Sequence, residues 1–293
     1  MLYTRKKFLK TATAGLAITA ITGKLLGCTS AAALGSSGNI KNFGLQLYTL
    51  RDVLPKDPKG VLKQVAAMGY KQVESYEGAQ GMFWGMKNTE FKKYMDDLGM
   101  KIVSSHCDIN KDFEKKAAEA AAIGMKYLIC PYKGPQKEID AFKKFADEFN
   151  QKGEICKKNG IRFAYHNHDY SFATMNGEMG QDVMMKNTDS SLVDFELDMY
   201  WVVAAGQDIE TWLKKYPKRF RLCHVKDRKK GAPLTDKDES VVVGTGSINY
   251  PKILKTAKKY GMEYYIIEQE KWEGTTPMQA AQADAVYMKT LSI

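Results

Sequence analysis

The sequence has few of the residues that build zinc or disulfide frameworks. Its 293 residues include only four histidines and five cysteines, and no two cysteines form a C-x-x-C pair. A thiolate zinc site is therefore not expected. Cys107, Cys130 and Cys223 lie in or next to apolar, strand-like runs. We expect them to be buried free thiols rather than partners in disulfides.

Acidic residues are missing from the first 27 positions. Five basic residues there supply half of the formal net charge of +10. The basic composition therefore gives little support to a nucleic-acid partner, and we expect none. A hydrophobic share of 44% with 27% charged residues is ordinary for a folded protein and excludes a disordered chain.

Segment 1–27 has the pattern of a bacterial signal peptide. A basic start is followed by an uncharged, mostly apolar run over 11–23, which is too short to span a bilayer. Leu25-Leu26-Gly27-Cys28 then resembles a lipobox, in which cleavage before the cysteine exposes its thiol for diacylglyceryl attachment. We expect a lipidated Cys28, a flexible tether over 28–42, and a lipid-anchored protein of the bacterial cell envelope that faces the periplasm. A buried N-terminal helix is the alternative.

Long apolar runs are absent after the tether, so the lipid anchor is the only membrane attachment expected. One local pattern repeats there instead: an amphipathic helix ends at a glycine, and a short β-rich run follows. The glycines are Gly69, Gly99, Gly124, Gly160 and Gly261. A glycine past the end of a helix supplies the left-handed cap that turns the chain back. Runs that are apolar on both faces indicate a buried parallel sheet.

Eight strands and eight helices are predicted. The strands are Phe43–Leu47, Gln72–Glu74, Ile102–Ser104, Tyr127–Cys130, Phe163–Tyr165, Val193–Leu197, Phe220–Cys223 and Tyr264–Ile267. The helices are Lys59–Met68, Thr89–Leu98, Phe113–Ile123, Ile139–Asn159, Gln181–Lys186, Ile209–Tyr216, Tyr250–Tyr260 and Pro277–Leu291. Eight β/α repeats predict a single-domain (β/α)₈ TIM barrel over residues 43–293. An open doubly wound sheet would need a glycine-rich turn after the first strand, which this sequence lacks.

Polar residues gather at the carboxyl ends of these strands, where barrel enzymes build their active sites. All four histidines are among them. The set is Gln46, Glu74, His106, His166, His168, Asp198, His224, Glu268 and Glu270. Three of these carry candidate acid/base groups: Glu74, His106 and His168. Trp84 and Trp201 are candidate substrate-binding aromatics, because sugars stack on such rings. Gln46 and Glu270 are candidate substrate-binding polar groups.

A candidate metal site follows from the last four strands, whose ends carry His166, Asp198, His224 and Glu268. Mixed nitrogen and carboxylate ligands suit one divalent ion such as Mn²⁺, Co²⁺, Zn²⁺, Fe²⁺ or Mg²⁺. Such an ion polarises a carbonyl and so assists removal of a proton from the neighbouring carbon.

The chain from Phe43 onward resembles the xylose-isomerase-like TIM barrels, the sugar phosphate isomerase/epimerase family. The matching motifs are Gly44-Leu45-Gln46-Leu47-Tyr48-Thr49, Tyr165-His166-Asn167-His168-Asp169, Asp194 to Trp201, His224-Val225-Lys226-Asp227, Gly244-Thr245-Gly246 and Ile267-Glu268. The resemblance implies one metal site with Asp198, His224 and Glu268 as ligands. The family often has a glutamate in the strand-5 place, so either His166 or His168 is the fourth ligand here. Lys226 looks like the family's substrate-contacting lysine.

These patterns predict a metal-dependent sugar isomerase or epimerase that abstracts a proton next to a carbonyl, with lyase action on a 3-keto-glycoside as a variant. Its partner is a small-molecule carbohydrate. A non-catalytic sugar-binding lipoprotein on the same barrel is the alternative. Nuclease chemistry, which occurs in the same superfamily, fits less well because it needs more histidine and glutamate ligands than four histidines allow.

Overall fold

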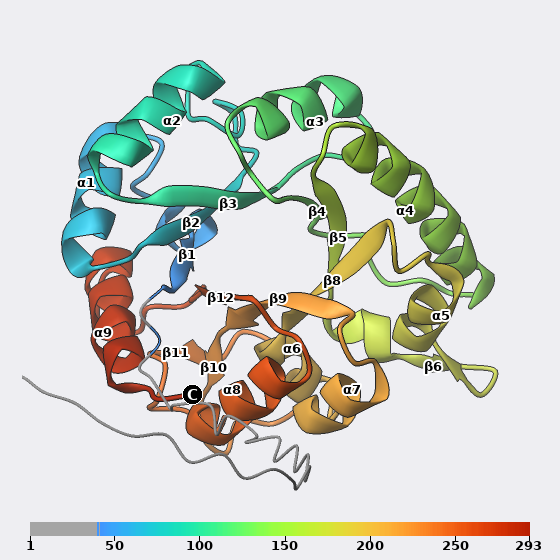
Figure 1. The fold of residues 1–293 in the computed structure, drawn as a ribbon. Coiled ribbons are helices and arrows are strands. Elements are labelled where there is room, and N and C mark those ends of the chain that lie inside the picture. The colour runs from blue at the N-terminus through green and yellow to red at the C-terminus, as the bar shows by residue number, and fades with distance from the viewer. Residues whose placement is uncertain (1–39, 41) are drawn as a thin grey trace, which may run out of the picture. The chain divides into compact units, whose positions relative to one another are not determined.

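A computed structural model describes residues 40 and 42–293 of the chain. The predicted signal segment and Cys28 lie outside the described residues. Eight parallel strands close into one barrel in the order β1-β12-β9-β8-β5-β4-β3-β2 (Figure 1). They are β1 (Gly44–Gln46), β2 (Gln72–Tyr76), β3 (Lys101–His106), β4 (Tyr127–Cys130), β5 (Arg162–His166), β8 (Val193–Asp198), β9 (Phe220–Val225) and β12 (Tyr264–Ile267). The predicted (β/α)₈ barrel is confirmed.

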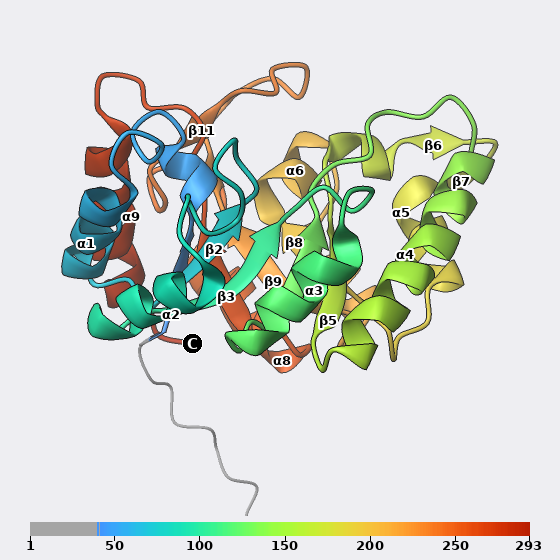
Figure 2. The same ribbon diagram turned by 90° about the horizontal axis from the view of Figure 1, so that it is seen from above.

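Helices surround the barrel (Figures 1 and 2). They are α1 (Pro58–Met68), α2 (Asn88–Asp97), α3 (Phe113–Ala122), α4 (Asp140–Lys158), α5 (Gly180–Asn187), α6 (Met199–Ala204), α7 (Ile209–Lys215), α8 (Tyr250–Lys259) and α9 (Pro277–Thr290). The eight predicted helices agree with these to within a residue or two at each end. The short helix α6 was not predicted. None of the helices in the described part of the chain combines the length and the apolar character needed to cross a bilayer.

Short elements at the strand ends were also not predicted. Two short antiparallel ribbons pair β6 (Thr174–Met175) with β7 (Glu178–Met179), and β10 (Asp227–Arg228) with β11 (Ser240–Val241). Two 3-10 turns, η1 (Leu47–Leu50) and η2 (Asp169–Phe172), directly follow β1 and the β5 loop. All of these elements lie after strand ends, where they shape the mouth of the barrel.

Local sequence explains why the helices begin and end where they do. Asp57 caps α1, with its Oδ1 accepting from the backbone N–H of Gly60 at 2.9 Å, and Pro58 occupies the first turn. The helix ends at Gly69, whose φ of 99° is the left-handed conformation that the repeated glycine predicted. At α9, Thr276 and Gln279 cap each other's backbone N–H groups in a capping box.

Side chains inside the barrel change from apolar to polar along the strand direction. Tyr127, Ile129, Ala164 and Leu222 form a buried hydrophobic cluster of β4, β5 and β9. Two residues further along two of these strands, His166 and His224 are also buried. Because side chains of a strand alternate between faces with a period of two, these histidines share the interior face with the apolar residues below them. The apolar residues thus lie beneath the polar layer at the mouth, and the one acid on their level, Asp194, is paired there with Arg162 at 2.9 Å.

The four cysteines that the structure describes, Cys107, Cys130, Cys156 and Cys223, are buried and unpaired. Burial raises the pKa of each thiol. These groups therefore behave as small core residues and not as nucleophiles.

Candidate functional site

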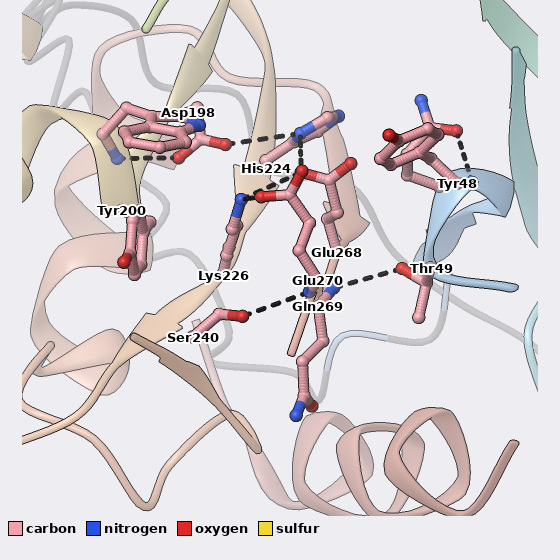
Figure 3. A network of polar contacts seen from close by, with 12 residues as sticks. Tyr48, Thr49, Asp198, Tyr200, His224, Lys226, Ser240, Glu268, Gln269 and Glu270 are labelled. Atoms are coloured by element: carbon pink, nitrogen blue, oxygen red, sulfur yellow. Dashed lines mark hydrogen bonds and ion pairs between the residues drawn. The ribbon is translucent and has the colours of Figure 1, made fainter. Parts of the chain in front are cut away.

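Asp198, His224 and Glu268 meet at the carboxyl ends of β8, β9 and β12. Each offers one ligand atom, and these atoms all lie within 4.8 Å of one another. The Nδ1 atom of His224 is 3.5 Å from Oδ2 of Asp198 and 3.2 Å from Oε2 of Glu268 (Figure 3). All three side chains are buried. The structure therefore brings together three of the four predicted metal ligands.

The two carboxylate oxygens of Asp198 have different surroundings. Oδ1 caps α6 by accepting from the backbone N–H of Trp201 at 2.9 Å. Oδ2 is buried and has no hydrogen-bond partner among the described residues. A buried carboxylate oxygen without a donor is costly. A divalent ion between Asp198, His224 and Glu268 would supply the missing partner, so these residues fit a metal site.

His166 ends β5 and His168 follows it, and the two side chains lie in different places. His166 is buried, with Nε2 3.8 Å from Oδ2 of Asp198. The ring of His168 packs against Trp201 and Tyr132, with centroids 5.2 and 5.1 Å away. His166 is thus next to the three clustered ligands, whereas His168 belongs to an aromatic wall of the mouth.

Glu196 is a site residue that the sequence analysis missed. It is fully buried, and its Oε2 lies 2.8 Å from Nε2 of His106 and 3.1 Å from Nδ1 of His166. His106, His166, Glu196 and His224 form a second group of potential ligands. The signal was available: Asp194, Glu196 and Asp198 alternate with apolar residues along one strand, so all three share the interior face.

Glu74 lies beneath the mouth and does not line its cavity. It is fully buried and accepts hydrogen bonds from Gln46 Nε2 at 2.7 Å and from the hydroxyl of Ser104. Its Oε1 is also 2.8 Å from Nε2 of His224 and 3.1 Å from Nε2 of His106. The predicted substrate-binding residue Gln46 is therefore engaged with Glu74, and both support the two imidazoles from below.

Lys226 is 1% exposed and pairs with two carboxylates from the end of β12. Its Nζ contacts Glu270 and lies 3.4 Å from Oε2 of Glu268 (Figure 3). The lysine also lies over the rings of Tyr200 and Trp201 at 4.9 and 5.0 Å. The predicted substrate-binding residues Lys226, Glu270 and Trp201 are thus adjacent to the metal-ligand candidates.

A cavity of about 330 Å³ opens above these groups. Its lining residues come from the ends of seven strands: Tyr48, Tyr76, Glu77, His106, Cys107, Asp108, Pro131, Tyr132, His166, His168, Trp201, Glu268 and Glu270. Trp84 is not among them. It is buried behind Tyr76, with ring centroids 4.8 Å apart, and its Nε1 donates to Ser75 Oγ at 3.0 Å. In this structure Trp84 therefore supports the wall of the cavity from behind.

Buried charges at the mouth shift the pKa values of several groups in opposite directions. Burial alone would raise the pKa of Glu74, but His106 and His224 hold it well below its usual range. Burial alone would lower the pKa of His106, but Glu74 and Glu196 raise it to about 9. Burial lowers the pKa of His168 to about 4. Near pH 7 the cavity is therefore lined by a proton donor, His106, and a neutral imidazole, His168.

The closed (β/α)₈ barrel and a polar cluster at the carboxyl ends of its strands define an active-site architecture of the TIM-barrel class. The family model described as xylose isomerase-like TIM barrel matches residues 62–291. The chain therefore belongs to the xylose isomerase-like TIM barrel family, and the predicted family membership is confirmed.

Two solved structures and one group of curated proteins illustrate the range of relatives. A sugar phosphate isomerase/epimerase from Parabacteroides distasonis is 30% identical, with a TM-score of 0.74, over 88% of this chain and 96% of that one. The IolI protein, whose structure holds a zinc atom, is 17% identical with a TM-score of 0.69, over 83% and 95% of the two chains. At this identity the likeness shows the fold alone.

The curated relatives include the inosose dehydratase of Clostridium perfringens. It is 27% identical over 164 residues, which are 51% of this chain and 54% of the relative. The chain thus spans about half the length of the curated relatives that it matches first. A relative from Mesomycoplasma hyopneumoniae with the same name is 24% identical over 85% of both chains.

Proposed function

We propose that this protein is a divalent-metal-dependent enzyme that abstracts a proton from the carbon next to the carbonyl of a sugar. The single observation that carries the proposal is the buried cluster of Asp198, His224 and Glu268, in which Oδ2 of Asp198 makes no hydrogen bond, directly beside the cavity. When bound there, a divalent ion polarises a carbonyl oxygen and stabilises the negative charge that develops on it. His166 completes the proposed ligand set.

The residues of the chain supply the proton transfer. His106 and His168 both line the cavity from different strand ends. His106 is held by Oε2 of Glu196 at 2.8 Å and has the role of proton donor. His168, a neutral imidazole near pH 7 because burial lowers its pKa to about 4, has the role of proton acceptor. Glu74 does not reach the cavity, so its part in the proposal is to orient His224 and His106.

Isomerisation, epimerisation and elimination of a leaving group share this first proton abstraction. The relatives carry both kinds of name, isomerase/epimerase and dehydratase. A dehydratase-type reaction needs a leaving group on the carbon next to the one that loses its proton, and a lyase acting on a 3-keto-glycoside meets that need. We further propose, from the leader sequence, that the enzyme is a lipoprotein of the cell envelope, anchored through Cys28.

Solvent exchange tests the proposed chemistry. The metal-loaded full chain is incubated in D₂O with a panel of keto-sugars and 3-keto-glycosides, and recovered substrate and product are analysed by mass spectrometry and NMR. We expect deuterium at the carbon next to the carbonyl. A label that passes wholly from one carbon to its neighbour would indicate a hydride shift and would overturn the acid/base roles.

A sugar-binding protein without catalysis is the second candidate, and the aromatic lining of the cavity favours it. Tyr48, Tyr76, Tyr132 and Trp201 offer faces for sugar rings whether or not a reaction follows. Saturable binding of the same sugars without any exchange or turnover would establish this candidate and reject the enzyme.

A further inference from the structure

Two aromatic walls face each other across the mouth of the barrel. One consists of Tyr48 and Tyr76, which follow β1 and end β2 and pack edge to face with centroids 5.2 Å apart. The other consists of Tyr132 and Trp201, which follow β4 and β8, with His168 packed against both rings. In the closed barrel, β3 lies between the walls on one side and β9 and β12 on the other.

Carboxylates occupy both intervals between the walls. Glu77 and Asp108 follow β2 and β3, and Glu268 and Glu270 follow β12. The mouth therefore alternates around its circumference between ring faces and pairs of hydrogen-bond acceptors. Ring faces bind the C–H surfaces of sugars, and ionised carboxylates accept hydrogen bonds from hydroxyl groups.

The cavity lining that the structure describes contains no lysine or arginine, and its protonated His106 is already held by Glu196 at 2.8 Å. The nearest lysines are engaged as well. Lys116 Nζ lies 2.6 Å from Oε2 of Glu77 and donates to the backbone oxygen of Asp108 at 2.8 Å. Lys226 is held by Glu270 and Glu268. A phosphate group needs such donors, and at this mouth it would face carboxylates instead.

Arg51 completes this set of engaged cations. It donates to the backbone oxygens of Tyr48 at 3.2 Å and Glu270 at 2.7 Å, and its guanidinium stacks between the rings of Tyr48 and Trp272. The arginine therefore links the first aromatic wall to the β12 loop, and two of its N–H groups are engaged with backbone oxygens. A divalent ion in the site below would have the carboxylates of Asp198 and Glu268 beside it, which offset its charge.

The exposure of the two walls indicates a ligand larger than one ring. Tyr132 is 57% exposed and Tyr48 is 38% exposed, and these are two of only four large hydrophobic side chains exposed among the described residues. Both stand at the rim, above the buried groups of the proposed site. Exposed rings beside a cavity offer their faces to a part of the ligand that extends beyond the cavity.

We propose that the cavity takes an uncharged carbohydrate with a second ring, that is, a glycoside, and that it discriminates against sugar phosphates. The inference rests on the proposed function in assigning the cavity to a sugar, and it adds the substrate class. The reacting sugar lies over the buried cluster, its hydroxyls meet the carboxylates of Glu77, Asp108 and Glu270, and the second ring stacks against Tyr132 at the rim.

Binding of unreactive probes to the full chain tests this class. Isothermal titration and tryptophan fluorescence are used with D-glucose, D-galactose and D-xylose, their phosphate esters and their phenyl glycosides. We expect each phosphate to bind about tenfold more weakly than its parent sugar, and each phenyl glycoside about tenfold more tightly, as one stacked ring provides. Phosphates that bind as well as their parent sugars, or no binding of any probe, would overturn the proposal.

Matched variants connect the result to the named residues. Tyr132→Leu removes the ring and should abolish the tighter binding of the phenyl glycosides, while the affinity for the parent sugars stays the same. Tyr132→Phe keeps the ring and should retain the tighter binding of the phenyl glycosides. Asp108→Asn keeps the acceptor for the Asn110 N–H at 2.9 Å but removes a negative charge. It should therefore reduce the difference in affinity between each sugar phosphate and its parent sugar. Asp112→Asn, exposed outside the cavity lining, is the control.

The two proposals fail in different ways. If the probes bind as expected but no substrate exchanges deuterium, the proposed chemistry falls and the ligand class stands. If exchange occurs and the phosphate esters bind best, the chemistry stands and the ligand class falls.

Discussion

Nε2 of His224 lies 2.8 Å from Oε1 of Glu74, a residue on the far side of the barrel interior. The same imidazole presents Nδ1 to Asp198 and Glu268. A histidine whose second nitrogen donates to a buried carboxylate is held in one tautomer and one orientation, and this is the usual support of a metal-binding imidazole. The pair explains why an acid at the end of β2 belongs to a site that is built on β8, β9 and β12.

Glu74→Gln tests this supporting role. Glutamine keeps the shape but removes the charge that accepts the N–H of His224, so we expect metal affinity to fall by about 10- to 100-fold without being lost. Competition with a chelator of known affinity measures the change. Unchanged metal affinity together with lost deuterium exchange would instead show that Glu74 is an acid/base group.

Asp198→Asn tests the metal site without removing the helix cap. Asparagine still accepts from the Trp201 N–H, but it replaces the charged oxygen that makes no hydrogen bond, so we expect the stoichiometric metal to be lost. Elemental analysis of the purified protein measures it. The matched control is Asp208→Asn, which alters an exposed cap at α7 outside the cavity and should leave metal content unchanged. Full occupancy in Asp198→Asn would reject the site.

Much of this architecture could be predicted because the barrel strands are short apolar runs, several of which follow a glycine that ends a helix. Strand ends with a histidine or an acid are visible in the sequence, and so the clustered residues Asp198, His224 and Glu268 were expected together. Glu196 could not be found from the strand ends, because it lies two residues before the end of β8, on the same face as Asp198. The position of Trp84 could not be predicted, because it depends on a loop in which Trp84 itself has a φ of 55°.

Helix α6 shows another limit of sequence patterns. Its six residues, Met199–Ala204, are almost all apolar and too few to show a helical period. The helix forms because Asp198 caps it at the end of β8. The same residue thus ends a strand, starts a helix and offers its second oxygen to the site. Only the end of the strand could be predicted from the alternating pattern of apolar residues.

Cys28 lies outside the described residues, so its lipidation stays a prediction from the lipobox-like sequence. Cys28→Ala should prevent attachment of radiolabelled fatty acid and shift the protein from the membrane to the soluble fraction. Cys156→Ala, a buried cysteine on α4, is the control and should keep both properties. Labelling and membrane partitioning of Cys28→Ala equal to those of the wild type would contradict the prediction.

Asp284 gives a pH-dependent prediction away from the cavity. This residue of α9 is fully buried, accepts from the Val243 N–H through Oδ1 at 2.7 Å, and has no partner at Oδ2 among the described residues. Burial, with the nearby charge of Asp227, raises the pKa of Asp284 to about 7. In the unfolded chain an aspartate has a pKa of about 3.9. Between these values the folded protein holds a proton that the unfolded chain has released.

The sign of the effect follows from this difference. Because the folded state binds more protons between about pH 4 and pH 7, the free energy of unfolding falls as the pH rises through that range. Asp284→Asn keeps the acceptor for Val243 and stays neutral at every pH. Its stability relative to the wild type should therefore increase from pH 4 to pH 7.5, by at most about 4 kcal/mol. Urea unfolding at several pH values measures the difference, with the exposed Asp236→Asn as the control. A difference that is the same at every pH would show that Asp284 is ionised in the folded protein.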